Sequence, residues 1–139
     1  MLVIDANNSI LGRLATVVAK KSLLGETIKV VNCENAVIIG KKKNVLSKYK
    51  QKADRGIPTK GPFIPKTPDR FVRRVIRGML PHERARGRVA FKNIMCYIGI
   101  PDELKGKKYI VIKEASLETS KGYGYTTVKE ICKYLKGTV

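Results

Sequence analysis

Two short apolar runs near the start of the chain flank an amphipathic helical pattern, and this order of elements constrains the fold more than any other feature. The runs cover residues 2–4 and residues 28–31. Between them, apolar residues recur at helical spacing, at Ile10, Leu11, Leu14, Ala15 and Val18. Ser9 suits the N-cap of this helix, and Gly25 suits its C-terminal cap. A strand, a helix and a strand in this order form a right-handed unit with parallel strands.

Two further apolar runs, residues 36–39 and 109–112, also have the length of strands. Short continuous apolar runs are typical of strands that helices cover on both faces of a sheet. We therefore predict an α/β fold with a mostly parallel central sheet of about four strands, helices on both faces and a basic Gly/Pro-rich loop. The 139 residues are expected to form a single domain, residues 1–139, because a chain of this length is too short for two cores.

Four more helices are expected after residue 40. One covers residues 41–54, and a second begins at Pro68. A third directs four apolar side chains inward, those of Phe91, Ile94, Met95 and Ile98. The last helix begins with a capping box formed by Thr127 and Glu130 and ends at Gly137.

The net charge of +18 is concentrated in the middle of the chain. Residues 41–92 hold 17 basic and three acidic side chains, a net charge of +14, whereas residues 1–40 and 93–139 carry +1 and +3. Such repulsion within a compact chain indicates a polyanionic partner, with nucleic acid favoured over an anionic membrane surface. An ordinary solvated face is disfavoured, because such faces mix charges of both signs.

The helix predicted from Pro68 carries the clearest basic face. Thr67 is expected to cap it, and Asp69 favours its positive end. Four arginines recur on one side, at Arg70, Arg73, Arg74 and Arg77. Apolar residues occupy the opposite side, at Phe71, Val72, Val75, Ile76, Met79 and Leu80. Arginine can grip a phosphate with two hydrogen bonds or stack on a base, so this helix is expected to face the nucleic acid.

We predict that residues 41–92 form the RNA-facing segment. The basic side chains assigned to RNA binding are Lys41, Lys42, Lys43, Lys48, Lys50, Arg55, Lys60, Lys66, Arg70, Arg73, Arg74, Arg77, Arg84, Arg86 and Arg88. Only 6% of the chain is aromatic. This scarcity favours contact with the shape and phosphates of folded RNA or duplex over stacking on single-stranded bases.

Residues 55–68 contain six Gly or Pro residues and few apolar ones. Proline restricts this stretch, but nothing in it predicts a helix or strand. A surface loop or extended arm is favoured over a linker between two domains. We expect this arm to be mobile in the free protein and fixed on RNA.

The residues offer little for catalysis. One histidine, His82, follows a proline and has no predicted partner, so an exposed turn residue is favoured over a catalytic base. A nucleic-acid-processing enzyme would need carboxylates beside the basic face to hold magnesium, and that segment contains only Asp54, Asp69 and Glu83. A nucleotide-binding domain would need a glycine-rich fingerprint, which the sequence lacks. The run 40–43 suits a nucleic-acid phosphate as well as a free nucleotide.

The cysteines and the apolar runs argue against a zinc protein, a disulfide-rich protein and a membrane protein. Cys33, Cys96 and Cys132 are odd in number and far apart, so we expect buried free thiols in a reducing cytosol rather than a zinc site or disulfides. No apolar run approaches the roughly 20 residues that span a bilayer, and the first residues lack a signal-peptide pattern. We therefore expect no catalytic site, no metal and no cofactor.

Several motifs within residues 2–101 occur in a specific combination. Those near the start are Ile4-Asp5-Ala6, Leu11-Gly12-Arg13-Leu14-Ala15, Val31-Asn32-Cys33-Glu34 and Ile39-Gly40-Lys41-Lys42. Those further along are Val75-Ile76-Arg77-Gly78-Met79-Leu80-Pro81-His82, Arg86-Gly87-Arg88 and Ile98-Gly99-Ile100-Pro101. Together they resemble the large-subunit ribosomal protein L-thirteen family, in its archaeal and eukaryotic form.

The resemblance implies an α/β domain with a mostly parallel sheet, in agreement with the pattern of the residues. It also implies a structural constituent of the large ribosomal subunit that binds large-subunit (23S-type) rRNA beside neighbouring ribosomal proteins and is added early in assembly. It implies no catalytic activity, no membrane partner and no small-molecule substrate.

Overall fold

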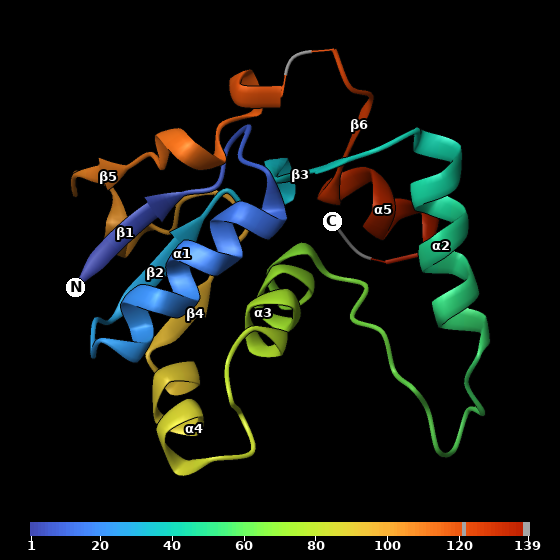
Figure 1. The fold of residues 1–139 in the computed structure, drawn as a ribbon, viewed down its shortest axis with the longest axis horizontal. Helices are drawn as coiled ribbons and strands as arrows, with labels where there is room; N and C mark the ends of the chain where they lie inside the picture. The colour runs from blue at the N-terminus through green and yellow to red at the C-terminus, as the bar shows by residue number, and fades with distance from the viewer. Residues whose placement is uncertain (121, 138–139) are drawn as a thin grey trace.

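A four-stranded sheet, on the left in Figure 1, is the main sheet of the fold, and we call it the central sheet. The computed structural model describes residues 1–120 and 122–137. The strands follow the order β4-β2-β1-β5, and every neighbouring pair is parallel. Their bounds are β1 (Leu2–Asp5), β2 (Ile28–Val31), β4 (Ile94–Cys96) and β5 (Tyr109–Ile110). The predicted α/β fold with a parallel sheet of four strands is confirmed.

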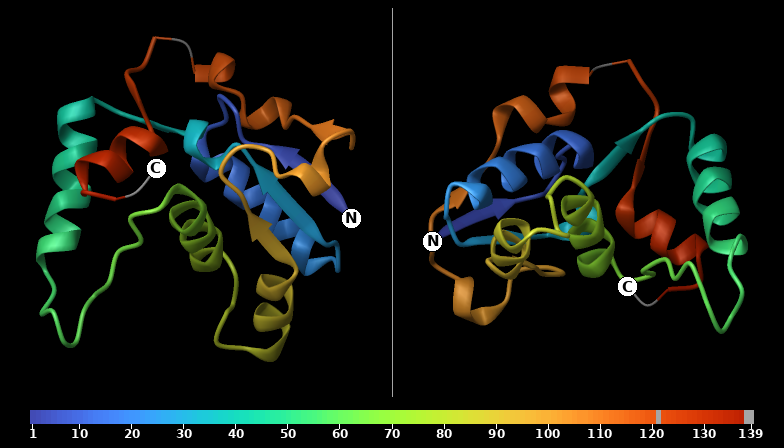
Figure 2. Two further views of the ribbon diagram at one scale, coloured as in Figure 1. Left: turned by 180° about the vertical axis from the view of Figure 1, so that it is seen from behind. Right: turned by 60° about the horizontal axis from the view of Figure 1, so that its bottom comes forward.

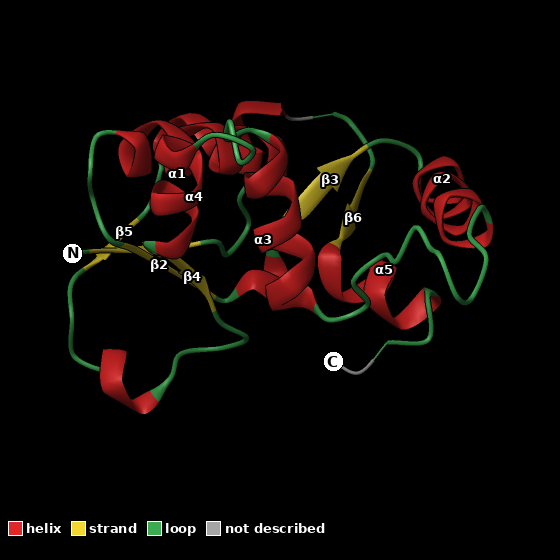
Figure 3. Ribbon diagram, turned by 90° about the horizontal axis from the view of Figure 1, so that it is seen from below, coloured by secondary structure: helices red, strands yellow, loops and turns green. Residues whose placement is uncertain are grey.

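One face of this sheet is covered by long helices. The helices of the fold are α1 (Leu11–Leu23), α2 (Lys42–Asp54), α3 (Pro68–Gly78), α4 (Ala85–Lys92) and α5 (Val128–Tyr134). Helix α1 connects β1 to β2, as predicted, and contacts both α3 and α4. Viewed along the sheet, α1 and α4 lie on the same side of it (Figure 3). The buried Leu14 and Val18 of α1 share a core with Ile4 and Ile28 of the sheet.

Among the described residues, the 3-10 turn Asp102–Leu104, rather than a long helix, covers the other face of the sheet. The buried Leu104 packs there against Val3 and Val31, and Tyr97 and Tyr109 border the cluster. One short turn suffices, because only a small cluster of apolar side chains has to be shielded on this face.

The predicted cap of α1 is confirmed at its C-terminal end and is wrong at its N-terminal end. Gly25 has a φ of 96°, and its amide donates to the Ser22 carbonyl, so it closes α1 as predicted. Ser9 is not the N-cap, because Ile10 occupies that position. Ser9 is buried instead, and its hydroxyl donates to the Asn7 carbonyl at 3.4 Å.

The run at residues 36–39 does not join the central sheet, contrary to its place in the predicted sheet. Strand β3 (Val37–Ile39) pairs antiparallel with β6 (Tyr125–Thr127) in a separate two-stranded sheet. The left-handed backbone of Asn32, with a φ of 55°, turns the chain after β2. Strand β4 takes the fourth position in the central sheet, and β5 ends at Ile110, two residues before the predicted end.

The helix that was predicted to carry Phe91, Ile94, Met95 and Ile98 is shorter than expected. Helix α4 ends at Lys92, and the chain then forms β4, in which Ile94 and Cys96 are buried while Met95 is 40% exposed. This alternation is that of a strand with one buried face. Ile98 is 46% exposed, so its expected inward position, like that of Met95, is wrong. Apolar residues spaced three and four apart fit a helix, but the same spacing also occurs here in a short strand followed by a loop.

Helices α2 and α5 lie beyond α3, away from the central sheet (Figure 2). Helix α5 contacts both α3 and α2. It begins with the predicted capping box, in which the Glu130 amide donates to the Thr127 hydroxyl. Its end differs from the prediction, because the helix stops at Tyr134 and Lys136 adopts the left-handed conformation, with a φ of 58°.

Gly137 takes part in helix termination, because its amide donates to the Cys132 carbonyl at 2.8 Å, and it also makes a close contact with another segment. A Cβ on Gly137 would lie 1.9 Å from the Lys66 carbonyl oxygen. The absence of a side chain therefore lets the chain after α5 lie directly against the loop that precedes α3. This contact joins the C-terminal helix to the Gly/Pro-rich loop.

Candidate nucleic-acid interface

The predicted RNA-binding side chains are almost all open to solvent. Helix α2, the loop of residues 55–67, α3 and the start of α4 carry them. The exposed ones are Lys41, Lys42, Lys43, Lys48, Lys50, Arg55, Lys60, Lys66, Arg70, Arg74, Arg84, Arg86 and Arg88. Arg73 and Arg77 are partly buried. We call this set of fifteen side chains the basic face.

Helix α3 has the two-sided character that its sequence predicts. Pro68 begins the helix, and Phe71, Val72 and Ile76 are buried. Thr67 occupies the N-cap position, although its side chain forms no capping hydrogen bond. Met79 was expected among the apolar residues of the inner side, but it follows the last helical residue and is exposed. Helical periodicity does not apply beyond the end of the helix.

Arg73 is engaged within the protein. Its guanidinium carbon lies 4.5 Å from the centroid of the Phe91 ring, and its Nη2 donates to the Phe91 carbonyl at 3.5 Å. Arg70 and Arg74 are exposed on the same helix. Of the arginines predicted on one side of this helix, Arg73 therefore packs against α4, whereas Arg70 and Arg74 are open to a ligand.

Helix α2 begins in a cluster of three lysines. Lys41 is its N-cap, Lys42 and Lys43 follow, and its first turn contains no acidic residue. Positive side chains at the positive end of a helix are unfavourable, and a bound anion would relieve this repulsion. Lys42 is partly neutralised, because its Nζ donates to Glu130 Oε1 at 2.7 Å. This hydrogen bond is the main reason why the pKa of Glu130 is lowered from its ordinary value.

Helix α2 is anchored to α3 through aromatic side chains. The rings of Tyr49 and Phe71 lie with their centroids 5.1 Å apart. Burial raises the pKa of the Tyr49 hydroxyl, and Lys52 lies over the same ring, 5.3 Å from its centroid. Two aromatic residues of the basic segment thus serve packing, and the exposed lysines of α2 project from a helix that is anchored to α3.

The start of α4 is held close to the preceding turn by Gly87. A Cβ at this buried glycine would lie 2.0 Å from the Pro81 carbonyl oxygen. The Nη2 of Arg88 donates to the Glu83 carbonyl at 3.0 Å, which fixes one of the arginines around this turn. His82 is exposed in the turn, as predicted.

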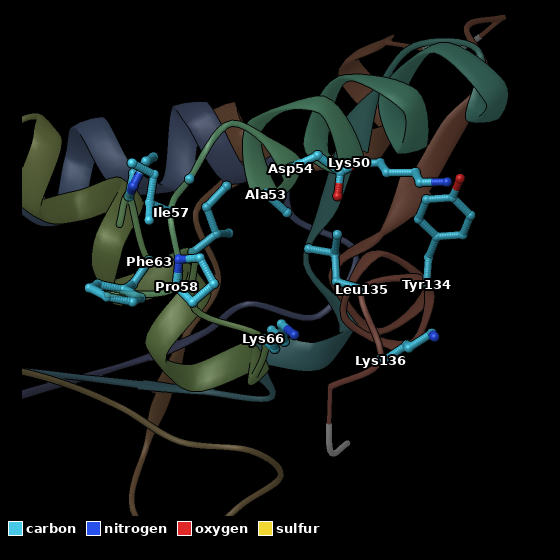
Figure 4. A pocket seen from close by; sticks show the side chains of 13 residues that line it. Lys50, Ala53, Asp54, Ile57, Pro58, Phe63, Lys66, Tyr134, Leu135 and Lys136 are labelled. Carbon is cyan, nitrogen blue, oxygen red and sulfur yellow. The ribbon is translucent and has the colours of Figure 1, made fainter. Parts of the chain in front are cut away.

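Sequence reasoning missed the contribution of the C-terminal helix to this region. Tyr134 and Lys136, at the end of α5, lie near Lys50 of α2 and Lys66 of the loop (Figure 4). The net charge of only +3 over residues 93–139 gave no indication that Lys136 would lie in this region. The sequence shows that the last helix ends with a tyrosine and a lysine close together. It does not show which distant segment they approach in the fold.

The three cysteines are free and buried, as predicted. Burial raises the pKa of the Cys132 thiol to about 11. A hydrogen bond with Cys96, together with burial, holds the pKa of Cys33 well above its ordinary value. Neither Cys33 nor Cys132 is therefore a thiolate at neutral pH.

Two further features of the described residues bear on other classes of function. No group of three or more His, Cys, Asp or Glu side chains suited to a metal ion occurs within residues 1–120 and 122–137. Over the same residues, no helix combines the length and the apolar character needed to cross a membrane.

Comparison with known sequences identifies the family. The profile of the family described as Ribosomal protein L13 matches residues 1–103. The chain belongs to the ribosomal protein L13 family. The match extends from β1 through the arginine-bearing α3 to the 3-10 turn below the sheet, so it includes the whole of the basic face.

Archaeal members of the L13 family are similar over almost the full chain, in agreement with the predicted branch. The large ribosomal subunit protein uL13 of Archaeoglobus fulgidus is 47% identical over 134 residues, which are 96% of this chain and 86% of that protein. The uL13 of Methanosarcina barkeri is 46% identical over 132 residues, 94% of each chain. The uL13 of Haloarcula marismortui is 40% identical over 134 residues, 96% of this chain and 90% of the relative.

Proposed function

We propose that this protein is a structural constituent of the large ribosomal subunit and binds large-subunit rRNA through the basic face. One observation carries the proposal. Thirteen of the fifteen side chains are exposed, and among the described residues only Lys42 of this set forms an ion pair. Unpaired cations on one segment repel each other, and the phosphates of RNA neutralise them.

Contact with phosphates gives affinity without reading the sequence. Each neutralised phosphate releases counterions, so a protein with six to ten such contacts loses about 10³- to 10⁵-fold in affinity between 50 and 200 mM salt. Recognition then depends on the shape of folded RNA, because structured RNA displays its phosphates and 2′-hydroxyls in fixed positions.

A role in early assembly follows from the same physics. Binding to phosphates needs no other protein, so the basic face can engage large-subunit rRNA before neighbouring ribosomal proteins arrive. The face also gives no support to catalysis, because its segment holds 17 basic and only three acidic side chains.

Charge-matched variants test the proposal. The triple variant Arg70→Gln, Arg74→Gln, Arg77→Gln should bind a fragment of large-subunit rRNA more weakly, with a salt slope reduced by about three. The control Lys105→Gln, Lys107→Gln, Lys108→Gln removes the same charge from exposed residues near β5. Affinity is measured against salt, and incorporation into large subunits is measured in cells. Equal weakening by both triple variants would show that total charge, and not the basic face, governs binding.

A further inference from the structure

A cavity of about 700 Å³ opens between α2, the loop of residues 55–67 and the end of α5 (Figure 4). Helix α2 provides Lys50 and Asp54 to it, and α5 and its C-terminal end provide Tyr134 and Lys136. The loop provides the remaining wall, with Ile57, Pro58, Gly56, Pro62, Phe63, Ile64 and Lys66. Cavities that hold small organic groups measure roughly 300–1,000 Å³, so this one has the size of a binding site.

The charge of the cavity favours an anion. Lys50, Lys66 and Lys136 contribute three ammonium groups to its lining, against the single carboxylate of Asp54. These lysines form no ion pair with any of the described residues. Three cations drawn from three separate segments surround one space, which is the arrangement that a phosphate group neutralises.

The cavity also exposes aromatic surface that the fold does not use. Phe63 is 65% exposed and Tyr134 is 46% exposed. In Figure 4 the two rings lie toward opposite ends of the cavity, with Lys66 between them. Exposed ring faces beside cations are the combination on which nucleic-acid bases stack.

Two close contacts border the cavity. Gly61 has a φ of 80°, and a Cβ there would lie 3.0 Å from the Phe63 ring, so the turn and the ring lie close together. At the other side, Gly137 lies directly against the backbone of Lys66. The contact at Gly137 fixes one side of the cavity, which lowers the conformational entropy lost when a ligand binds.

We propose that this cavity receives one unpaired nucleotide of RNA. The base stacks on Phe63 or Tyr134, and the adjoining phosphates lie among Lys50, Lys66 and Lys136. The inference rests on the proposed function, because it requires that the chain binds RNA. It adds a site for a base to a surface that otherwise contacts phosphates, and it makes the protein selective for RNA with a bulged residue.

Two RNA hairpins test the inference. One is fully paired, and the other carries a single bulged adenosine in the same stem. Affinity for the full chain is measured at one fixed salt concentration by fluorescence anisotropy. The bulged hairpin should bind about tenfold more tightly, which corresponds to about 1.4 kcal/mol, within the range for one stacked base. Phe63→Ala with Tyr134→Ala should remove this preference and leave binding of the paired hairpin unchanged.

Tyr123→Ala is the matched control, because it removes an exposed aromatic ring outside the cavity. It should keep the tenfold preference. Urea unfolding of every variant establishes that each is folded. Equal affinity of the wild-type chain for both hairpins would overturn the nucleotide site and leave RNA binding intact. A preference that survives loss of both rings, or that Tyr123→Ala removes equally, would also overturn it. Failure to bind either hairpin would overturn the proposed function itself.

Discussion

The guanidinium of Arg73 stacks on the ring of Phe91 and so ties helix α3 to the last turn of α4. Arg74, the next residue along the helix, is exposed. A cation over an aromatic ring contributes about 0.5–2 kcal/mol, depending on how far water is excluded. Adjacent arginines of α3 thus differ in their surroundings, because Arg73 packs against Phe91 and Arg74 is exposed to solvent.

Arg73→Gln should lower the free energy of unfolding by about 1 kcal/mol and leave the salt slope of RNA binding nearly unchanged. Arg74→Gln should change the free energy of unfolding by less than about 0.5 kcal/mol and reduce the salt slope by about one. Urea unfolding and RNA titrations at several salt concentrations measure the two effects. The reverse pattern would mean that Arg73 leaves Phe91 to contact RNA.

Gly87→Ala should destabilise the protein by about 1–3 kcal/mol, the usual cost of overfilling a packed site. The new methyl group would meet the Pro81 carbonyl at 2.0 Å, so α4 or the turn must shift. Gly12→Ala is the control, because this exposed glycine in the first turn of α1 has nothing within 4 Å of a Cβ. Thermal unfolding of both variants measures the difference, and equal melting temperatures would contradict the close contact at Gly87.

The ion pair between Lys42 and Glu130 should make stability depend on pH. The pKa of Glu130 is held below its ordinary value near 4.5, first by the hydrogen bond from Lys42. A carboxyl with a lowered pKa in the folded state stabilises the fold above its ordinary pKa, and the stabilisation is lost as the pH falls from about 4.5 through the folded pKa. Because the pair is exposed, it contributes only about 0.2–1 kcal/mol.

Glu130→Gln tests this dependence, because Gln can still occupy the third position of a capping box. At pH 7 the variant should unfold more easily than the wild type, and the difference should shrink as the pH falls below 4.5. Urea unfolding across this range provides the measurement. Glu118→Gln, which alters an exposed glutamate elsewhere, serves as the control. A difference that is constant with pH would rule out the ion pair as its source.

The fold could be predicted from the sequence where the signal is local. The length and apolar character of residues 2–4 and 28–31 indicate buried strands, and the spacing between them indicates a helix, so the parallel unit follows. The partner of a strand is not a local property. Val37–Ile39 is a strand as predicted, yet it pairs with β6, because the turn at Asn32 directs it away from the central sheet. The short β4 was hidden by a helical spacing that continues past Asn93.

In the candidate site too, the features with a local signal could be predicted and the tertiary contacts could not. Helical periodicity places Arg70 and Arg74 on the outer face of α3, so their exposure could be predicted. The pairing of Arg73 with Phe91, 18 residues later, depends on how α3 and α4 cross, and no spacing rule contains it. The approach of Tyr134 and Lys136 to Lys50 is likewise a tertiary contact between segments more than 80 residues apart. A sum of charges over consecutive residues cannot reveal a cluster of this kind.

Trypsin should cleave the free protein after Lys60 sooner than after Lys66. Lys60 is exposed in a turn whose Lys60 and Gly61 amides both donate to the Ile57 carbonyl. The backbone of Lys66 instead lies against Gly137, so this part of the loop must detach before it can enter a protease. Exposed, weakly packed loop tips are where proteases act first. Mass spectrometry of the earliest fragments distinguishes the two cuts.

An rRNA fragment should suppress the cut after Lys60, because phosphates held by Lys60 and its neighbours would immobilise the turn and block the protease. The two sites share one loop, one residue type and one digestion, so the ratio of their cleavage rates is independent of protease activity. Gly137→Ala should raise the rate at Lys66 toward that at Lys60, since the added methyl group displaces the Lys66 backbone. Equal resistance at Lys60 with and without RNA would mean that the whole loop is packed on its own domain, and the expectation of an arm ordered by RNA would be wrong.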